Sequence, residues 1–177
     1  GVRILPGAPF SMSLLFPLRE PGTPEERDHM IMEIAFREAE LAASNDEVPV
    51  GAVVVRGARI LGRGGNQVEA LQDSTAHAEM IALTQAMANV GEKRLEGAEL
   101  FCTLEPCIQC CGAILHSRLA RVVFGAYDLK FGGVKSLAKL FDIRNLNHKL
   151  EYRGGLCEER SAQLLKHFFQ SKRKNKA

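Results

Sequence analysis

The sequence predicts an α/β domain with three layers, α/β/α, in which helices cover both faces of a mixed five-stranded sheet. The main observation is the order of elements: apolar runs of strand length alternate with segments of helical spacing, a pattern typical of parallel strands joined by crossover helices. A short connection at Gly57 and Ala58 between the first two strands indicates a hairpin. A length of 177 residues, 46% of them hydrophobic, suits one domain with one substantial core.

The first helix begins at a clear start signal. Thr23 can cap the helix, Pro24 suits its first position and Glu26 completes a capping box, so we expect a helix over residues 24–44. Apolar residues at helical spacing within it would face the sheet: Met30, Ile31, Ile34, Ala35 and Leu41.

The remaining elements follow from changes of period along the chain. We expect strands over residues 50–55, 59–62, 100–104, 121–125 and 150–152, and helices over residues 76–88, 107–116, 137–141 and 157–172. This order places the starts of two neighbouring helices at one edge of the sheet, where α/β folds usually bind their ligands.

The N-terminal stretch, residues 1–22, is rich in proline and glycine and shows neither period. We expect a poorly ordered extension there, followed by a folded domain over residues 23–177. Pro6, Pro9 and Pro17 interrupt the apolar residues of the extension, which argues against a signal peptide. An odd number of cysteines, five, and the lack of any run long enough to cross a bilayer predict a reduced, cytoplasmic protein with no membrane association.

The net charge of +2 is too small to indicate a nucleic-acid partner, but its distribution is uneven. Basic residues gather at the C-terminus, where two interpretations stay open: contact with phosphates, or a solvated tail that aids solubility. These residues are Lys166, Lys172, Arg173, Lys174 and Lys176.

Two short motifs carry the chemistry. His77, Cys107 and Cys110 supply one nitrogen and two sulfurs, which is three corners of a tetrahedral zinc site, and a catalytic zinc keeps its fourth corner open. Glu79, two residues beyond the histidine, can act on a water there without binding the metal. A purely structural zinc would need a fourth protein ligand, and Cys111 projects about a hundred degrees around the helix from Cys110. We therefore expect one catalytic Zn²⁺ per chain.

The arrangement of both motifs, H-x-E followed by P-C-x-x-C, is typical of zinc-dependent base deaminases. The chain resembles the bacterial tRNA-specific adenosine deaminases of the cytidine deaminase-like superfamily from about Arg27 to its C-terminus. The resemblance rests on the zinc motifs together with the segments 47–52, 103–107, 116–118 and 123–126 and with Asn66, Asp128, Lys130, Phe168 and Phe169. The chain departs from the usual family pattern at Ser74 and at Phe131.

The resemblance implies hydrolytic deamination of adenosine to inosine at the wobble position of a tRNA anticodon, by a homodimer that holds the anticodon stem-loop. Glu79 would be the catalytic residue, carrying protons between water and base. Asn66 would bond to the flipped base, with Val48, Pro49 and Ala78 around it. Because RNA recognition favours bases stacked on aromatic side chains and phosphates held by cations, the remaining candidate substrate-binding residues are Asp128, Lys130, Phe168 and Phe169.

Two alternatives remain open. A deaminase of a free base or nucleoside, of the guanine or cytosine type, would share the zinc site and the fold. A non-catalytic, zinc-stabilised RNA-binding subunit would also keep the metal, although it would have no need of Glu79. Among other candidates, we interpret Cys102, Cys111 and Cys157 as packed and His116 as structural, and leave His148 undecided.

Overall fold

The computed structural model describes residues 21–174, and its centre is a five-stranded sheet in the order β2-β1-β3-β4-β5. The strands are β1 (Gly51–Arg56), β2 (Arg59–Gly65), β3 (Glu99–Leu104), β4 (Arg121–Ala126) and β5 (Glu151–Arg153). β1 runs antiparallel to both β2 and β3, whereas β3, β4 and β5 are parallel. The mixed five-stranded sheet is therefore confirmed, including the hairpin, in which Gly57 takes a left-handed φ of 60°.

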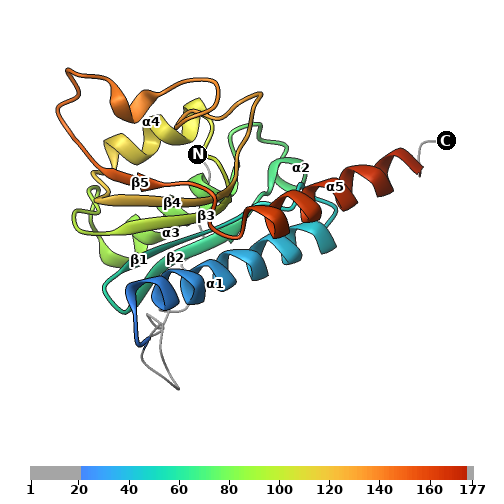
Figure 1. Ribbon diagram of the computed structural model, residues 1–177, viewed down its shortest axis with the longest axis horizontal. Helices are drawn as coiled ribbons and strands as arrows, with labels where there is room; N and C mark the ends of the chain where they lie inside the picture. Colours follow the sequence, from blue (N-terminus) through green and yellow to red (C-terminus); the bar gives the residue numbers. More distant parts are fainter. Residues whose placement is uncertain (1–20, 175–177) are drawn as a thin grey trace.

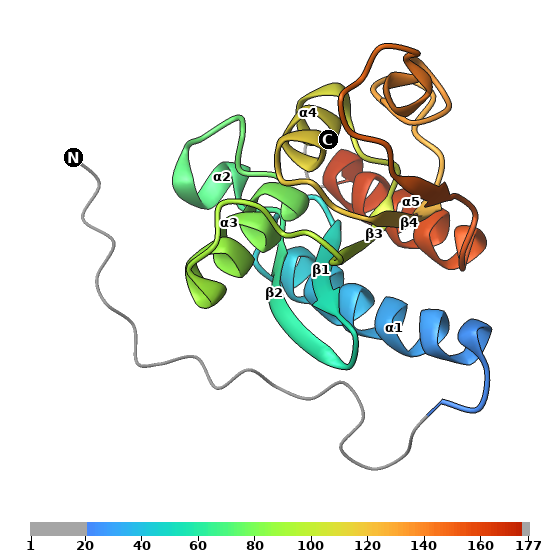
Figure 2. The same cartoon turned by 90° about the vertical axis from the view of Figure 1, so that its left-hand side faces the viewer.

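Helices cover both faces of the sheet and complete the three layers (Figures 1 and 2). On one face lie α1 (Pro24–Ser44) and α5 (Glu158–Lys174), joined by ion pairs from Arg160 to Glu33 at 2.5 Å and to Glu40 at 3.2 Å. On the other face lie α3 (Ala78–Val90) and α4 (Ile108–His116). Figure 1 shows that the C-terminal half of α5 projects beyond the edge of the sheet.

Alternating side chains of the central strands build two apolar clusters. Val53, Val55 and Phe101 face α1, while Val54 and Leu100 face α3 and α4. Such alternation is what a sheet buried on both faces requires. At Gly51 the helix lies so close that a Cβ atom would sit 1.9 Å from the carbonyl oxygen of Ala35. This close contact lets α1 pack directly against β1.

The start of α1 is confirmed. The Thr23 hydroxyl accepts a hydrogen bond from the N–H of Glu26 at 3.1 Å, and the Glu26 carboxylate accepts one from the N–H of Gly22 at 2.7 Å. The expected buried face is partly wrong, because Leu41 is 57% exposed. Ile31 and Ala35 are buried as expected, Met30 and Ile34 are partly buried, and the other apolar side chains that α1 buries are Met32, Phe36, Ala39 and Ala42.

Other boundaries shift in ways that have physical reasons. α3 and α4 begin after His77 and Cys107, respectively, because both residues keep extended backbone angles and cap the helix. A short helix, α2 (Val68–Leu71), was not expected, and the expected helix at residues 137–141 is only the 3-10 turn η1 (Leu140–Asp142). Most of the expected N-terminal extension lies outside the described residues. No helix in the described range 21–174 is both long and apolar enough to cross a membrane.

Candidate active site

The zinc motifs meet where the parallel strands β3 and β4 end. His77 is the N-cap of α3 and Cys107 the N-cap of α4, so both side chains stand at helix starts, next to unpaired backbone N–H groups. Cys110 lies one turn into α4 and is fully buried. Because a helix N-terminus carries partial positive charge, this position favours thiolates.

The three side chains form a compact group. The Nδ1 atom of His77 lies 3.5 Å from the sulfur of Cys107 and 3.6 Å from that of Cys110. All three ligand atoms lie within 4.8 Å of one another, and no second group of this kind is found within residues 21–174. One imidazole nitrogen and two sulfurs at this spacing fit a zinc ion with a fourth position for water.

The two thiols share their protons unequally. Hydrogen bonding from Cys110, which outweighs burial, lowers the pKa of Cys107 to about 4. The same hydrogen bond, together with burial, raises the pKa of Cys110. Binding a metal through both sulfurs must therefore release the Cys110 proton, so zinc affinity should increase with pH.

Glu79 lies in the first turn of α3, two residues from His77, and is only 4% exposed. Burial raises its pKa to about 7. A carboxyl group with a pKa close to neutrality can both accept and donate a proton, as general acid–base catalysis requires.

A cavity of about 800 Å³ opens onto these groups. His77, Glu79 and Cys107 line it, and so do five of the eight substrate-binding residues expected from sequence: Val48, Asn66, Asp128, Phe168 and Phe169. Pro49 and Ala78 are buried beside the cavity and do not line it, and Lys130 is exposed on the neighbouring turn. The fold thus brings together most of the predicted site, from six separate stretches of chain.

Glu47 is a residue of this site to which the sequence alone assigned no role. Its carboxylate is 1% exposed and accepts hydrogen bonds from the side-chain amide of Asn66 at 3.2 Å and from the N–H groups of Glu69 and Ala70 at 3.2 and 2.7 Å. Since an ionised carboxylate only accepts, it fixes which end of the Asn66 amide turns toward it. The signal available in the sequence was a glutamate directly before the apolar run that begins at Val48.

Asp128 and its turn form another wall. The Asp128 carboxylate accepts hydrogen bonds from the N–H groups of Lys130 and Phe131 at 3.0 and 3.2 Å, so one of its oxygens shapes its own turn. Phe131, where the chain departs from the usual family pattern, lines the cavity and is 65% exposed. Asp128 therefore helps to shape its own turn, and the wall presents an aromatic ring to solvent.

The projecting end of α5 forms the outer wall. The rings of Phe168 and Phe169 are nearly perpendicular, with centroids 5.5 Å apart. Lys172 pairs with Asp46 in the turn after α1 and lies 5.4 Å from the Phe168 ring centroid. Lys172 is thus already engaged in this structure, while Lys176 lies outside the described residues.

The other cysteines and histidines differ in their surroundings. Cys102 and Cys111 are fully buried, as expected, and burial raises the pKa of both thiols. Cys157 is partly buried and packs against the apolar cluster on the α1 side of the sheet, so its interpretation as packed is confirmed in part, and its sulfur also lies 3.5 Å from Nδ1 of His29. His148 bonds through Nε2 to the carbonyl oxygen of Leu119 at 2.6 Å, which indicates a structural role, and His116 is exposed.

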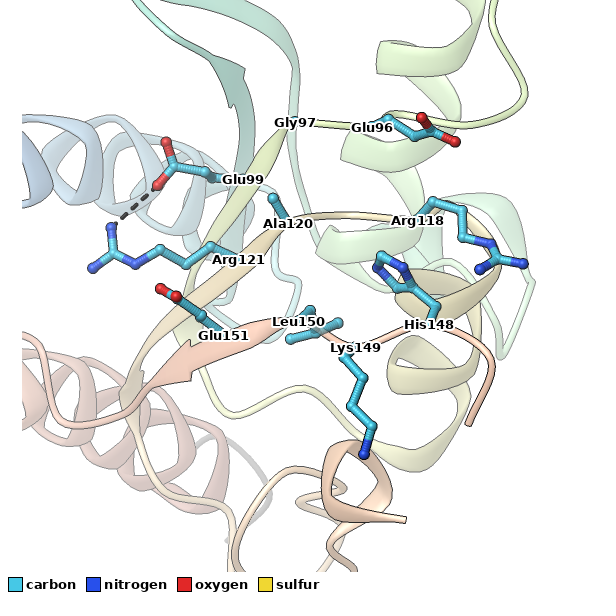
Figure 3. A pocket seen from close by; sticks show the side chains of 10 residues that line it. All are labelled: Glu96, Gly97, Glu99, Arg118, Ala120, Arg121, His148, Lys149, Leu150 and Glu151. Atoms are coloured by element: carbon cyan, nitrogen blue, oxygen red, sulfur yellow. Dashed lines mark hydrogen bonds and ion pairs between the residues drawn. The ribbon is translucent and has the colours of Figure 1, made fainter. Parts of the chain in front are cut away.

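A second cavity, of about 830 Å³, lies at the opposite edge of the sheet, where β3 and β4 begin (Figure 3). Its main cations are already bonded. Arg121 pairs with Asp28 at 2.6 Å and with Glu99 at 3.1 Å, and the Arg118 guanidinium donates to the carbonyl oxygen of Asn147. We call this cavity the distal groove.

Comparison with known proteins agrees with the site. The family described as the cytidine and deoxycytidylate deaminase zinc-binding region matches residues 25–126. A tRNA-specific adenosine deaminase of Agrobacterium fabrum is 43% identical over 148 residues, which cover 84% of this chain and 97% of that protein.

Two solved structures are also similar. One, from a study of A-to-I editing by tRNA:A34 deaminases at the wobble position of transfer RNA, is 42% identical, with a TM-score of 0.75 over 77% of this chain and 99% of the other. A guanine deaminase of Bacillus subtilis is 27% identical, with a TM-score of 0.55 over 82% of this chain and 93% of the other.

The mixed sheet and the zinc-binding group beside a buried glutamate define a zinc-dependent deaminase, which binds a single zinc ion. The identity to the tRNA-specific adenosine deaminase of Agrobacterium fabrum is 43% over 97% of that protein, against 27% for the guanine deaminase. This difference narrows the assignment to one kind of deaminase. The chain belongs to the family of tRNA-specific adenosine deaminases, as the motifs in the sequence predicted.

Proposed function

We propose that this protein hydrolyses the wobble adenosine of a tRNA anticodon to inosine, with release of ammonia. The observation that carries the proposal is the placement of Glu79: it is buried, two residues from the ligand His77, and faces the same cavity as Asn66. The names of the similar proteins support the choice of substrate.

For the metal we propose His77 through Nδ1, Cys107 and Cys110 as ligands, because these three atoms already lie within 4.8 Å of one another. When bound, zinc supplies the positive charge that lowers the pKa of water to about 7 and so makes hydroxide available at neutral pH. Cys111 stays outside this set, since its sulfur lies 3.5 Å from the carbonyl oxygen of Pro106.

Glu79 carries the protons of the reaction. It accepts one from the attacking water and delivers it to the ring nitrogen beside C6, which makes C6 more electrophilic, and the water oxygen then bonds to C6. Glu79 next transfers the second proton to the amino group, the C6–N bond breaks, and ammonia leaves inosine behind. Both transfers require one carboxylate close to water and base together, and the position of Glu79, which lines the cavity two residues from His77, supports this role.

The base must leave its stack to reach this carboxylate, at a cost of a few kcal/mol that is smallest in a loop. We propose that Asn66 bonds to the flipped base between Val48, Pro49 and Ala78. Asp128, Lys130 and the Phe168–Phe169 pair would then contact neighbouring nucleotides of the anticodon stem-loop. Phe169, which is 47% exposed beside Phe168 at the mouth of the cavity, supports this part, since a stacked base needs an accessible ring face.

We further propose that the protein is a homodimer. Apolar side chains gather beside the cavity where the turn after β4 meets the start of α4, and isolated chains rarely leave such a group uncovered. These side chains are Ile108, Leu129, Phe131 and Leu137. Sedimentation equilibrium tests the proposal: we expect twice the chain mass of 19.4 kDa, and a mass of one chain would overturn it. A tRNA substrate also supports a cytoplasmic location, which stays a prediction.

The deciding assay offers the zinc-loaded protein an anticodon stem-loop with adenosine at the wobble position, the same stem-loop with cytidine there, and free adenosine, adenine, guanine and cytosine. We expect inosine from the first substrate alone. Faster ammonia release from a free base would favour the guanine or cytosine type of deaminase. Binding of the stem-loop without any turnover would favour the non-catalytic RNA-binding subunit.

A further inference from the structure

Glu105 is a buried carboxylate beside the active site for which the proposed chemistry has no use. It follows the last residue of β3, stands two residues before Cys107, and is 2% exposed. Its backbone N–H donates to the carbonyl oxygen of Ala126 at 2.8 Å, which continues the pairing of β3 with β4. A glutamate in this position requires an explanation, because burying a charge is costly unless it is well bonded.

The carboxylate of Glu105 is bonded entirely by one segment, residues 128–136. Oε1 accepts from the N–H groups of Val134, Lys135 and Ser136 at 3.2, 2.6 and 2.9 Å. Oε2 accepts from the N–H of Asp128 at 3.0 Å and from the Ser136 hydroxyl. Five donors occupy the lone pairs of both oxygens, so Glu105 has none left with which to move a proton.

The segment needs these bonds because residues 128–136 form neither a helix nor a strand. Four of its backbone N–H groups, those of Asp128, Val134, Lys135 and Ser136, donate to the Glu105 side chain in place of a strand partner. It also lies against the metal-binding stretch: Gly133 N–H donates to the Pro106 carbonyl oxygen at 2.8 Å. A Cβ atom on Gly132 would be 2.4 Å from Glu105 Cδ, so only glycine allows this approach.

What the segment presents is the wall of the cavity formed by Asp128 and Phe131. We propose that Glu105 is a positioning residue, which holds residues 128–136 in the shape that presents this wall to the RNA substrate. The inference rests on the proposed function, from which it takes the RNA substrate. It extends that function by linking one wall of the cavity to the stretch that carries Cys107.

The test compares Glu105→Gln with Glu99→Gln. The two glutamates flank one strand, but Glu99 accepts from Arg27 and Arg121 at the distal groove, away from the cavity. In Glu105→Gln an NH₂ group replaces one acceptor and faces backbone donors, so we expect the segment to loosen. With the wobble-adenosine stem-loop, KM should rise about tenfold to a hundredfold, while kcat changes less than about threefold. Glu99→Gln should leave both constants unchanged.

Two further measurements separate positioning from a general loss of structure. Amide hydrogen exchange at Asp128, Val134, Lys135 and Ser136 should accelerate in Glu105→Gln, while the amides of β1 keep their protection. Zinc content should stay at one per chain. Unchanged KM with normal zinc, loss of zinc, or uniform acceleration of exchange would each overturn the proposal.

The design also separates this inference from the proposed function. If the parent protein does not deaminate the stem-loop, the proposed function fails, and hydrogen exchange still decides whether Glu105 holds the segment. If the parent is active and Glu105→Gln does not fold, the same measurements are made on Ser136→Ala. That variant removes one of the five donors, and we expect KM to rise about threefold, as loss of one hydrogen bond to a charged group allows. No rise in KM would overturn the inference.

Discussion

The two cavities of this protein have nearly the same volume, about 800 Å³ at the active site and about 830 Å³ at the distal groove, yet their chemistry differs. In the distal groove, Arg121 is neutralised by Asp28 and Glu99. At the active site, Glu79 is buried beside three metal-binding side chains and its pKa is raised to about 7. Volume therefore does not locate function here. A buried carboxylate with a strongly raised pKa beside a metal-binding group is the better indicator, since such perturbed groups cluster at functional sites.

The position of each cavity in the fold explains the difference. The active site lies where β3 and β4 end and where α3 and α4 begin, so helix starts supply partial positive charge. The distal groove lies where the same strands begin and is lined by residues of loops and strand starts. An α/β sheet usually binds its ligands at the carboxyl ends of its parallel strands, and this protein follows that rule.

The largest expected effect is on the metal. Replacing Cys110 with serine removes a thiolate ligand, and we expect zinc per chain to fall well below one, with loss of all measurable turnover. Cys111→Ser is the matched control, one residue along the same helix, and should retain its zinc. Metal analysis of the purified proteins measures both. Retained zinc in Cys110→Ser together with lost zinc in Cys111→Ser would contradict the ligand assignment.

The next effect separates the metal from proton transfer. Glu79→Ala should keep one zinc per chain while kcat falls by about 10² to 10⁴-fold, because in the proposed mechanism the carboxylate carries protons and does not bind the metal. Glu96→Ala makes the same change at the distal groove and should leave kcat unchanged. Single-turnover kinetics on the stem-loop measure this difference. Equal kcat values for Glu79→Ala and Glu96→Ala would contradict the assignment of proton transfer to Glu79.

A smaller effect is expected at Glu47. In Glu47→Gln an amide replaces the acceptor that holds Asn66, so Asn66 should lose its fixed orientation, and kcat/KM should fall about tenfold. Asn66→Ala should lower kcat/KM by at least the same factor. The double variant should have a kcat/KM only slightly below that of Asn66→Ala, because Glu47 acts through Asn66. Fully additive losses in this double-mutant cycle would show that Glu47 acts independently.

The smallest effect is expected at the C-terminus. Removing residues 172–177 takes away four cations, so binding of the stem-loop should weaken and its dependence on salt should become shallower. At saturating substrate, kcat should change little. Lys149→Ala removes a cation from the distal groove and should leave the salt dependence unchanged. An unchanged slope after truncation would favour the solvated tail.

The sequence predicted the elements whose signals are local. The cap at Thr23, the hairpin at Gly57 and the parallel order of the later strands all depend on residues close in the chain, and each is confirmed. The error at Leu41 has a different origin. Helical spacing places Leu41 at the border of the apolar stripe of α1. Ala42, the next residue, is buried against Gly65 of β2, so Leu41 is exposed because of the side of the helix on which it lies, and only packing decides how wide a buried face is.

Within the site, the zinc motifs alone predicted the chemistry. His77, Glu79, Cys107 and Cys110 were identifiable because a metal site needs fixed ligand types at short spacings, and these spacings survive any packing of the helices. The tertiary structure decided what surrounds them. Glu47 reaches Asn66 across 19 positions and Glu105 reaches Ser136 across 31, and such contacts leave no periodic signal in the chain. Which buried carboxylate carries protons and which ones hold walls depends on the donors that the fold brings to each oxygen.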